Sequence, residues 1–253
     1  MVTFCTEHIV ILVISFALLA GSACLVSKLN RKWQNGMFVF AAAACSFLIF
    51  FNCGMGLTFD GAVNWKGLAI QMLQVCQFNM ILTPLMLVPK FELARQYSVM
   101  FSMFAALTTF FSLPESFAAR PWYDHGFLNF WVFHWFAIAL PVWMVAARRL
   151  KPRKKYILPV TGCVFAYFTV VYIVCEQLKA AGILAADASF SFIYKSGHTF
   201  PLKQLYDLIG IPYFYLWPLI PLAAAFFWLL AWIFRSYKAG FTTEYFPDVQ
   251  LPK

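Results

Sequence analysis

The chain has 253 residues, of which 62% are hydrophobic, 20% are aromatic and only 11% are charged. Because soluble domains carry roughly a quarter charged residues, this composition excludes an ordinary soluble domain and requires a surface that faces hydrocarbon. The formal net charge of +9 does not indicate a nucleic-acid partner, since the densest basic run lies between two apolar stretches. Such a run sets membrane topology and contacts anionic lipid headgroups. It consists of Arg148, Arg149, Lys151, Arg153, Lys154 and Lys155.

Seven apolar runs follow one another along the chain, at residues 9–27, 37–57, 67–88, 97–113, 128–146, 156–175 and 213–234. They do not alternate apolar and polar residues as strands do, and each is long enough to span as a helix. The sequence therefore predicts an all-α, polytopic membrane bundle of about seven transmembrane helices, forming a single domain over residues 1–253. The fourth run is the shortest. The long connection at residues 177–212 is predicted to be a partly ordered outer loop.

The distribution of basic residues predicts the orientation of the bundle. The loops after the first, third and fifth runs, together with the C-terminal tail, hold 14 of the 19 Lys and Arg residues, and the other side holds 5. Since basic residues concentrate on the cytoplasmic side, we expect the N-terminus outside and the C-terminus in the cytoplasm. The first run lacks the basic segment that precedes a cleaved secretory signal, so it is predicted to remain as a helix.

The seven cysteines show no metal-binding spacing, neither C-x-x-C nor H-E-x-x-H. We therefore expect no metal and no cofactor. One alternative stays open, an outer zinc site built from His8, His125 and His198 with Asp124 or Asp207. Three cysteines lie near the predicted outer face, and a disulfide between two of them is open: Cys5, Cys53 and Cys175.

Polar residues inside the membrane are costly and often functional. The third run holds three glutamines, Cys76 and Asn79 within residues 71–79, and the fifth run holds His134. At a rise of 1.5 Å per residue, Cys76 lies roughly 13 Å and His134 roughly 9 Å below the outer start of their runs. Both would lie in the outer half of the membrane, on the same side as Glu176. Hydrogen bonds that merely hold helices together would produce the same pattern.

Three segments in order resemble the YwaF-type integral membrane protein family. They are residues 73–79 (Leu-Gln-Val-Cys-Gln-Phe-Asn), residues 127–134 (Phe-Leu-Asn-Phe-Trp-Val-Phe-His) followed by Pro141, and residues 201–215 (Pro-Leu-Lys-Gln-Leu-Tyr-Asp-Leu-Ile-Gly-Ile-Pro-Tyr-Phe-Tyr). The resemblance covers about residues 65 to 234. Gly210-Ile211-Pro212 stands where the family usually has Gly-Pro-Trp-Pro. The resemblance implies a multi-pass protein of the bacterial cytoplasmic (inner) membrane.

A eukaryotic relative in this family is a cysteine-dependent phospholipid acyltransferase, which implies Cys76 as the nucleophile and His134 as the base. A thiol in hydrocarbon ionises poorly, but a neighbouring imidazole can take its proton. The thiolate would attack a phospholipid ester and form an acyl-thioester, which a second lipid or water would resolve. Four further residues would bind the substrate, the first three as candidate oxyanion donors. They are Gln74, Gln77, Asn79 and Glu176.

Two other functions remain open. A transporter or channel could line its path with the polar residues of the third, fifth and sixth runs, although the paired broken helices of many transporters are not apparent. A membrane scaffold or accessory subunit without chemistry is the other alternative. A retinal-type sensor is disfavoured because residues 213–234 contain no lysine for a Schiff base. The sequence indicates no particular protein partner.

Overall fold

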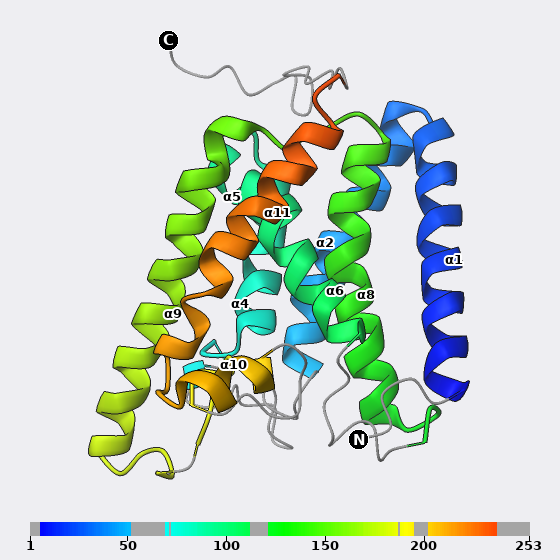
Figure 1. Cartoon of the computed structure of the whole chain (residues 1–253). Coiled ribbons are helices and arrows are strands. Elements are labelled where there is room, and N and C mark those ends of the chain that lie inside the picture. The colour runs from blue at the N-terminus through cyan, green and yellow to red at the C-terminus, as the bar shows by residue number, and fades with distance from the viewer. Residues whose placement is uncertain are drawn as a thin grey trace.

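The computed structural model describes residues 6–51, 69–70, 72–111, 121–186, 188–194 and 202–236. Every regular element in these ranges is helical, and none is a strand, as the sequence predicts. Four helical segments are long and apolar enough to cross a membrane: Thr6–Lys28, Phe127–Ala146, Lys154–Ala180 and Phe214–Ile233. The chain is therefore an integral membrane protein of the all-α class (Figure 1). The count of seven spans and the orientation stay predictions.

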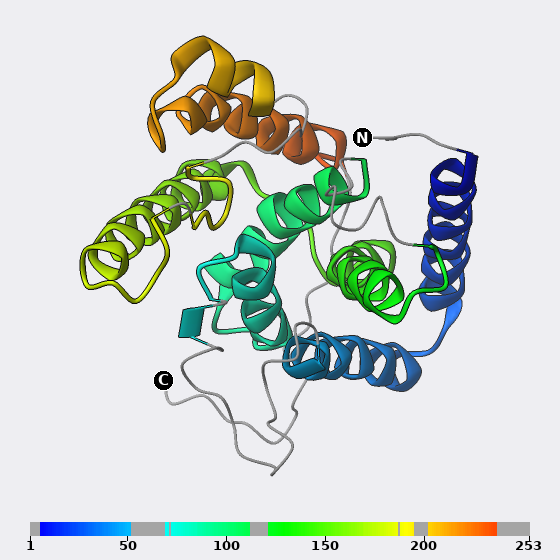
Figure 2. The same ribbon diagram turned by 90° about the horizontal axis from the view of Figure 1, so that it is seen from below.

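Three helices pack together on one side of the bundle (Figure 2). They are α1 (Thr6–Lys28), α2 (Arg31–Phe51) and α8 (His125–Ala146). Two tryptophans of α8 fasten α1: Trp131 donates its indole N–H to the Ser15 hydroxyl at 2.6 Å, and Trp143 donates to the Ser22 hydroxyl at 2.9 Å. Interhelical hydrogen bonds of this kind matter in lipid, where burial of apolar surface cannot drive helices together.

The other side consists of α9 (Ile157–Ala180), which the short helix η3 (Lys154–Tyr156) precedes, and α11 (Leu219–Ile233), which η4 (Phe214–Leu216) precedes. The amphipathic helix α10 (Leu202–Ile209) lies across the end of the bundle at which α9 ends (Figure 1). Its apolar residues pack on a cluster that contains Cys175, Ile193 and Tyr215. We call this end of the bundle, where α9 ends and α10 lies, the α10 end. The predicted outer loop at residues 177–212 thus holds the last turn of α9 and all of α10.

The third and fourth apolar runs lie between these two sides (Figure 2), and neither is one regular α-helix. In the third run, turns at residues 72–74 precede α4 (Val75–Leu82), and the 3-10 helix η1 (Thr83–Leu87) follows it. The fourth run is longer than predicted, since it is helical from residue 92 to residue 111. It comprises α5 (Glu92–Tyr97), the π-helix η2 (Ser98–Ser102) and α6 (Met103–Phe111). The sequence predicts one helix through the third run, whereas the structure has a turn before Val75, and this turn lies directly before the candidate site.

The basic run after α8 has two roles in the fold. Arg148 ends α8 with a left-handed backbone (φ 59°), and the N–H of Arg149 bonds back to the Met144 carbonyl at 2.8 Å, closing a Schellman-type helix end. Arg149 is buried, and its carbonyl accepts from the Arg95 guanidinium at 3.0 Å. Gln96 likewise donates to the Lys151 carbonyl at 2.9 Å. These contacts tie the α8–α9 connection to α5 at the end opposite α10, which we call the basic end.

Candidate functional site

The first turn of α4 is capped from a distant part of the chain. The backbone N–H of Val75 donates to the Ser191 hydroxyl at 2.8 Å, and that hydroxyl donates to the Leu73 carbonyl. The N–H of Ser191 in turn donates to the side-chain oxygen of Gln74 at 3.1 Å. The N-terminal N–H groups of a helix need partners outside the helix. Here a serine 116 residues further along the chain provides one of them.

The segment that carries Ser191 has an unusual backbone. Ser191 and Phe192 both lie in the left-handed region, with φ of 49° and 63°, which non-glycine residues rarely adopt. Two hydrogen bonds hold the segment there, from the Tyr213 N–H to the Ile193 carbonyl at 2.8 Å and from the Tyr215 hydroxyl to the Phe192 carbonyl. Strained backbone persists only where its surroundings fix it, and it is frequent at functional sites.

Cys76 is the second residue of α4, directly after the capped position. A side-chain hydrogen bond joins its thiol to the hydroxyl of Thr109 on α6. The Thr109 hydroxyl donates to the Ala105 carbonyl at 3.0 Å, so the neutral thiol is the donor to Thr109. A thiolate at Cys76 would reverse this bond, because Thr109 can rotate its hydroxyl toward the sulfur.

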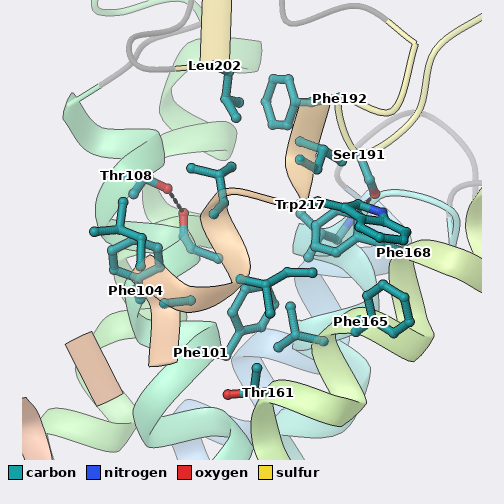
Figure 3. Close-up of a pocket in the computed structure, with 18 of the residues that line it drawn as sticks. Phe101, Phe104, Thr108, Thr161, Phe165, Phe168, Ser191, Phe192, Leu202 and Trp217 are labelled. Atoms are coloured by element: carbon teal, nitrogen blue, oxygen red, sulfur yellow. Dashed lines mark hydrogen bonds between the residues drawn. The ribbon is translucent and has the colours of Figure 1, made fainter. Parts of the chain in front are cut away.

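A cavity of about 300 Å³ lies between the central helices and the α9–α11 side (Figure 3). Cys76 and Thr109 are among the residues that line it. The other hydroxyls on the wall belong to Ser191, Thr108, Thr161 and Tyr213. The remaining lining is aliphatic and aromatic, with Phe101, Phe104, Phe165, Phe168, Phe192, Trp217 and Phe227 among its larger side chains. A cavity of this chemistry suits a hydrocarbon chain better than a polar solute.

The cavity is elongated along the helices. On η2 and α6 its lining residues run from Phe101 to Thr109, which corresponds to about 12 Å at 1.5 Å per residue. Phe192 and Leu202 lie at one end and Thr161 at the other (Figure 3). The fully buried Phe227 lines the same wall. Other lining residues are exposed on the lipid-facing surface, including Leu222 on α11. The lining therefore extends from the core of the bundle to its surface.

His134 lies on α8, 3% exposed and outside the cavity wall. Its Nδ1 is 2.8 Å from the Phe130 carbonyl, so Nδ1 carries the proton of the neutral ring. Within the described part of the chain, the buried Nε2 has no hydrogen-bond partner. No hydrogen bond joins His134 to Cys76 among these residues. Cys76 does pack against the buried cluster that contains Phe130 and Phe133, the two rings beside the imidazole.

The polar residues predicted to bind substrate are not among the described residues that line the cavity. Gln74 is engaged by Ser191, and Asn79 accepts a hydrogen bond from the Tyr97 hydroxyl at 2.9 Å. Gln77 is buried. Glu176 lies at the end of α9, where it accepts from the Tyr194 hydroxyl at 2.5 Å. Among the described residues, none of these four lines the cavity.

The Glu176–Tyr194 pair is a local feature of the α10 end. The ammonium of Lys179 lies 3.2 Å from the centre of the Tyr194 ring. Burial, together with the hydrogen bond to Glu176 and its charge, raises the pKa of Tyr194 above its usual value. The tyrosine therefore remains a hydrogen-bond donor, and the pair fastens the segment 188–194 to α9.

Sequence reasoning missed Thr109 and Ser191. Hydroxyls are common in membrane helices and in loops, so neither residue stands out in the sequence. The only hint is that Ser191 lies within the weakly apolar stretch from Phe190 to Tyr194 of the predicted outer loop.

The proposed zinc alternative receives no support where the structure is described. In those ranges no group of three His, Cys, Asp or Glu side chains could hold a metal ion. The ring of His8 is bound to the Phe110 carbonyl at 2.9 Å, and His198 lies outside the described residues. The disulfide prediction also falls partly outside them, because Cys5 and Cys53 are not described. Cys175 is buried and forms no disulfide with another described cysteine.

Comparison with known proteins gives one finding. The sequence model of the TMEM164 protein family matches residues 3–236 of the chain. This range includes every residue that lines the cavity. No curated protein and no solved structure shows significant similarity to the chain.

Proposed function

Since the chain belongs to the TMEM164 family, a family of membrane proteins, we propose that it is a membrane-embedded thiol acyltransferase. It moves acyl chains between membrane phospholipids through an acyl-cysteine intermediate at Cys76. The observation that carries the proposal is the position of the Cys76 thiol on the wall of an apolar, elongated cavity. The resemblance to the YwaF-type family leads to the same chemistry. We propose seven spans with the N-terminus outside, in the bacterial cytoplasmic membrane.

The reaction has two steps. The Cys76 thiolate, formed when His134 takes the thiol proton, attacks the carbonyl carbon of a phospholipid ester. A carbon–sulfur bond forms, the ester carbon–oxygen bond breaks, and the lysophospholipid leaves with the proton returned by His134. In the second step the hydroxyl of another lysophospholipid attacks the thioester and gives its proton to His134. A new ester carbon–oxygen bond forms, the carbon–sulfur bond breaks, and the Cys76 thiolate is restored. The cavity would hold the acyl chain throughout, so that the carbonyl stays beside the sulfur.

The helix start at Val75 supports the chemistry at Cys76. A cysteine in the first turn of a helix lies at the positive end of the helix dipole, which stabilises a thiolate. The Cys76 N–H has no acceptor within the helix, because it belongs to the first turn. It is therefore a candidate donor to the oxyanion of the tetrahedral intermediate. This role replaces the one expected of the Gln74 and Asn79 side chains.

We assign His134 as the base. Because its Nδ1 donates to the Phe130 carbonyl, the lone pair of Nε2 is available for a proton. The imidazole and the Cys76 side chain border the same buried cluster. Catalytic hydrogen bonds often tighten only when substrate is bound, so a resting separation is compatible with this role.

Acyl transfer in vesicles tests the proposal. The purified protein is reconstituted with a phospholipid that carries a labelled acyl chain and with an unlabelled lysophospholipid. We expect labelled product from the wild type and none from Cys76→Ala. The matched control is Cys163→Ala, since Cys163 is a partly buried cysteine of α9 that is not among the residues lining the cavity.

The same variants separate the alternatives. Full transfer activity in a folded Cys76→Ala protein would overturn the proposal. Solute flux across the vesicles that is equal in wild type and Cys76→Ala would instead support a transporter.

A further inference from the structure

We infer that Ser191 is a positioning residue for Cys76. The inference rests on the proposed function and assigns a role to the segment 188–194. The Ser191 hydroxyl holds the first turn of α4, and thereby sets the direction of the Cys76 side chain and N–H. Ser191 does not react with substrate in this account; it acts through α4.

The contacts of Ser191 all converge on the turn before Cys76. Its hydroxyl bonds the Val75 N–H and the Leu73 carbonyl, and its own N–H bonds the Gln74 side chain. One residue therefore contacts three consecutive positions, all immediately before the cysteine. Ser191 is only 1% exposed. These contacts are therefore shielded from the outer surface of the protein.

Tyr167 of α9 also contacts the turn before α4. The Tyr167 hydroxyl lies 3.2 Å from the Ser191 hydroxyl and donates to the Met72 carbonyl at 3.3 Å. The Tyr167 ring also stacks on Phe78, with ring centres 4.5 Å apart. The turn at residues 72–74 is thus fixed from α9 as well as from the segment 188–194.

The backbone of the segment indicates that this contact is not incidental. The hydroxyl reaches the turn from two successive left-handed residues, Ser191 and Phe192. An ordinary helix cap needs no such backbone, because a local Ser, Thr, Asp or Asn provides it. Here the residue at the cap position is Gln74, which makes no side-chain cap bond. The long-range contact takes the place of a local cap, directly beside the proposed nucleophile.

The first arm of the test separates positioning from folding. In the vesicle assay, Ser191→Ala is expected to lower kcat for acyl transfer about tenfold or more, with KM changed by less than about twofold. Ser191→Gly, which relieves the left-handed backbone but also lacks the hydroxyl, should show the same loss. The control is Ser189→Ala in the same segment, since the Ser189 hydroxyl bonds the Tyr194 N–H.

The second arm needs no acyl substrate. A small membrane-permeant maleimide is reacted with the protein, and the modified peptides are quantified by mass spectrometry. Labelling of Cys76 should slow in Ser191→Ala and, to a smaller degree, in Tyr167→Phe. Labelling of the exposed Cys24 on α1 should not change. The slower reaction is expected because a frayed first turn no longer stabilises the thiolate.

The outcomes distinguish the two claims. If the wild type transfers acyl chains and Ser191→Ala matches Ser189→Ala in kcat, the positioning role is overturned. If the wild type shows no transfer, the proposed function fails. The maleimide labelling experiment then tests the role of Ser191 without the activity assay. Cys76 labelling that is unchanged or faster in both Ser191→Ala and Ser191→Gly then contradicts it.

Discussion

The thiol of Cys76 is hydrogen-bonded to the Thr109 hydroxyl, and both groups lie on the wall of the same apolar cavity. Thr109→Val removes the hydroxyl and nearly keeps the shape of the side chain. We expect acyl-thioester formation to slow by about tenfold to a hundredfold, because a hydrogen bond to a charged group contributes about 1.5–3 kcal/mol. Thr108→Val is the control, since the Thr108 hydroxyl donates to the Ala105 carbonyl and no described hydrogen bond joins it to Cys76. Equal rates in the two variants would contradict a role for Thr109 at the sulfur.

The inner part of the cavity is expected to set the length of the acyl chain. Ala223 of α11 lines the cavity, so Ala223→Phe should reduce its volume and favour short acyl donors. The control is Ala225→Phe, because Ala225 is exposed on the same helix. The measurement is competition between lauroyl and stearoyl phospholipids. An unchanged preference in Ala223→Phe would show that the chain does not occupy this cavity.

The hydrogen bond between Tyr97 of the fourth run and Asn79 of the third run is predicted to stabilise the fold. Tyr97→Phe leaves the buried Asn79 oxygen without its donor and should cost about 1–3 kcal/mol of unfolding free energy. We expect a lower melting temperature in detergent and largely retained acyl transfer per folded molecule. A severe loss of activity at unchanged stability would instead assign Asn79 to the reaction.

The basic end is proposed to bind anionic lipid headgroups through its exposed residues. Arg148, Arg153, Lys154 and Lys155 are exposed, whereas Arg149 is buried in the α8–α9 connection. Replacing the four exposed residues by Gln should reduce the anionic phospholipid retained by the purified protein, as counted by mass spectrometry. The retention should also weaken with salt. Arg149→Gln should mainly lower stability, and equal lipid retention in all variants would contradict the proposal.

Composition was sufficient to predict the membrane class, because so few charged residues cannot cover a soluble surface. The long, non-alternating apolar runs predicted the all-helical fold. Helices lie within all seven predicted runs, four of them long and apolar enough to span. The break before Val75 was not predictable. No glycine or proline marks it, and the residue that caps it lies 116 positions away.

The candidate site was predictable in part. Intramembrane polarity drew attention to Cys76 and Asn79, which have different surroundings in the fold. Cys76 lines a cavity, whereas Asn79 bonds a tyrosine of the next helix. Polarity indicates that a buried group needs a partner, but it does not say whether that partner is a substrate or another helix. Only the three-dimensional arrangement brings Thr109 and Ser191 to Cys76.

The most direct measurement is the mass of the peptide that contains Cys76 after incubation with a phospholipid carrying a labelled acyl chain. The account predicts a labelled acyl adduct on Cys76 that hydroxylamine removes, as expected of a thioester. It also predicts that His134→Ala forms this adduct much more slowly. Product formation by a protein whose Cys76 stays unmodified, with the label on another residue, would contradict the account.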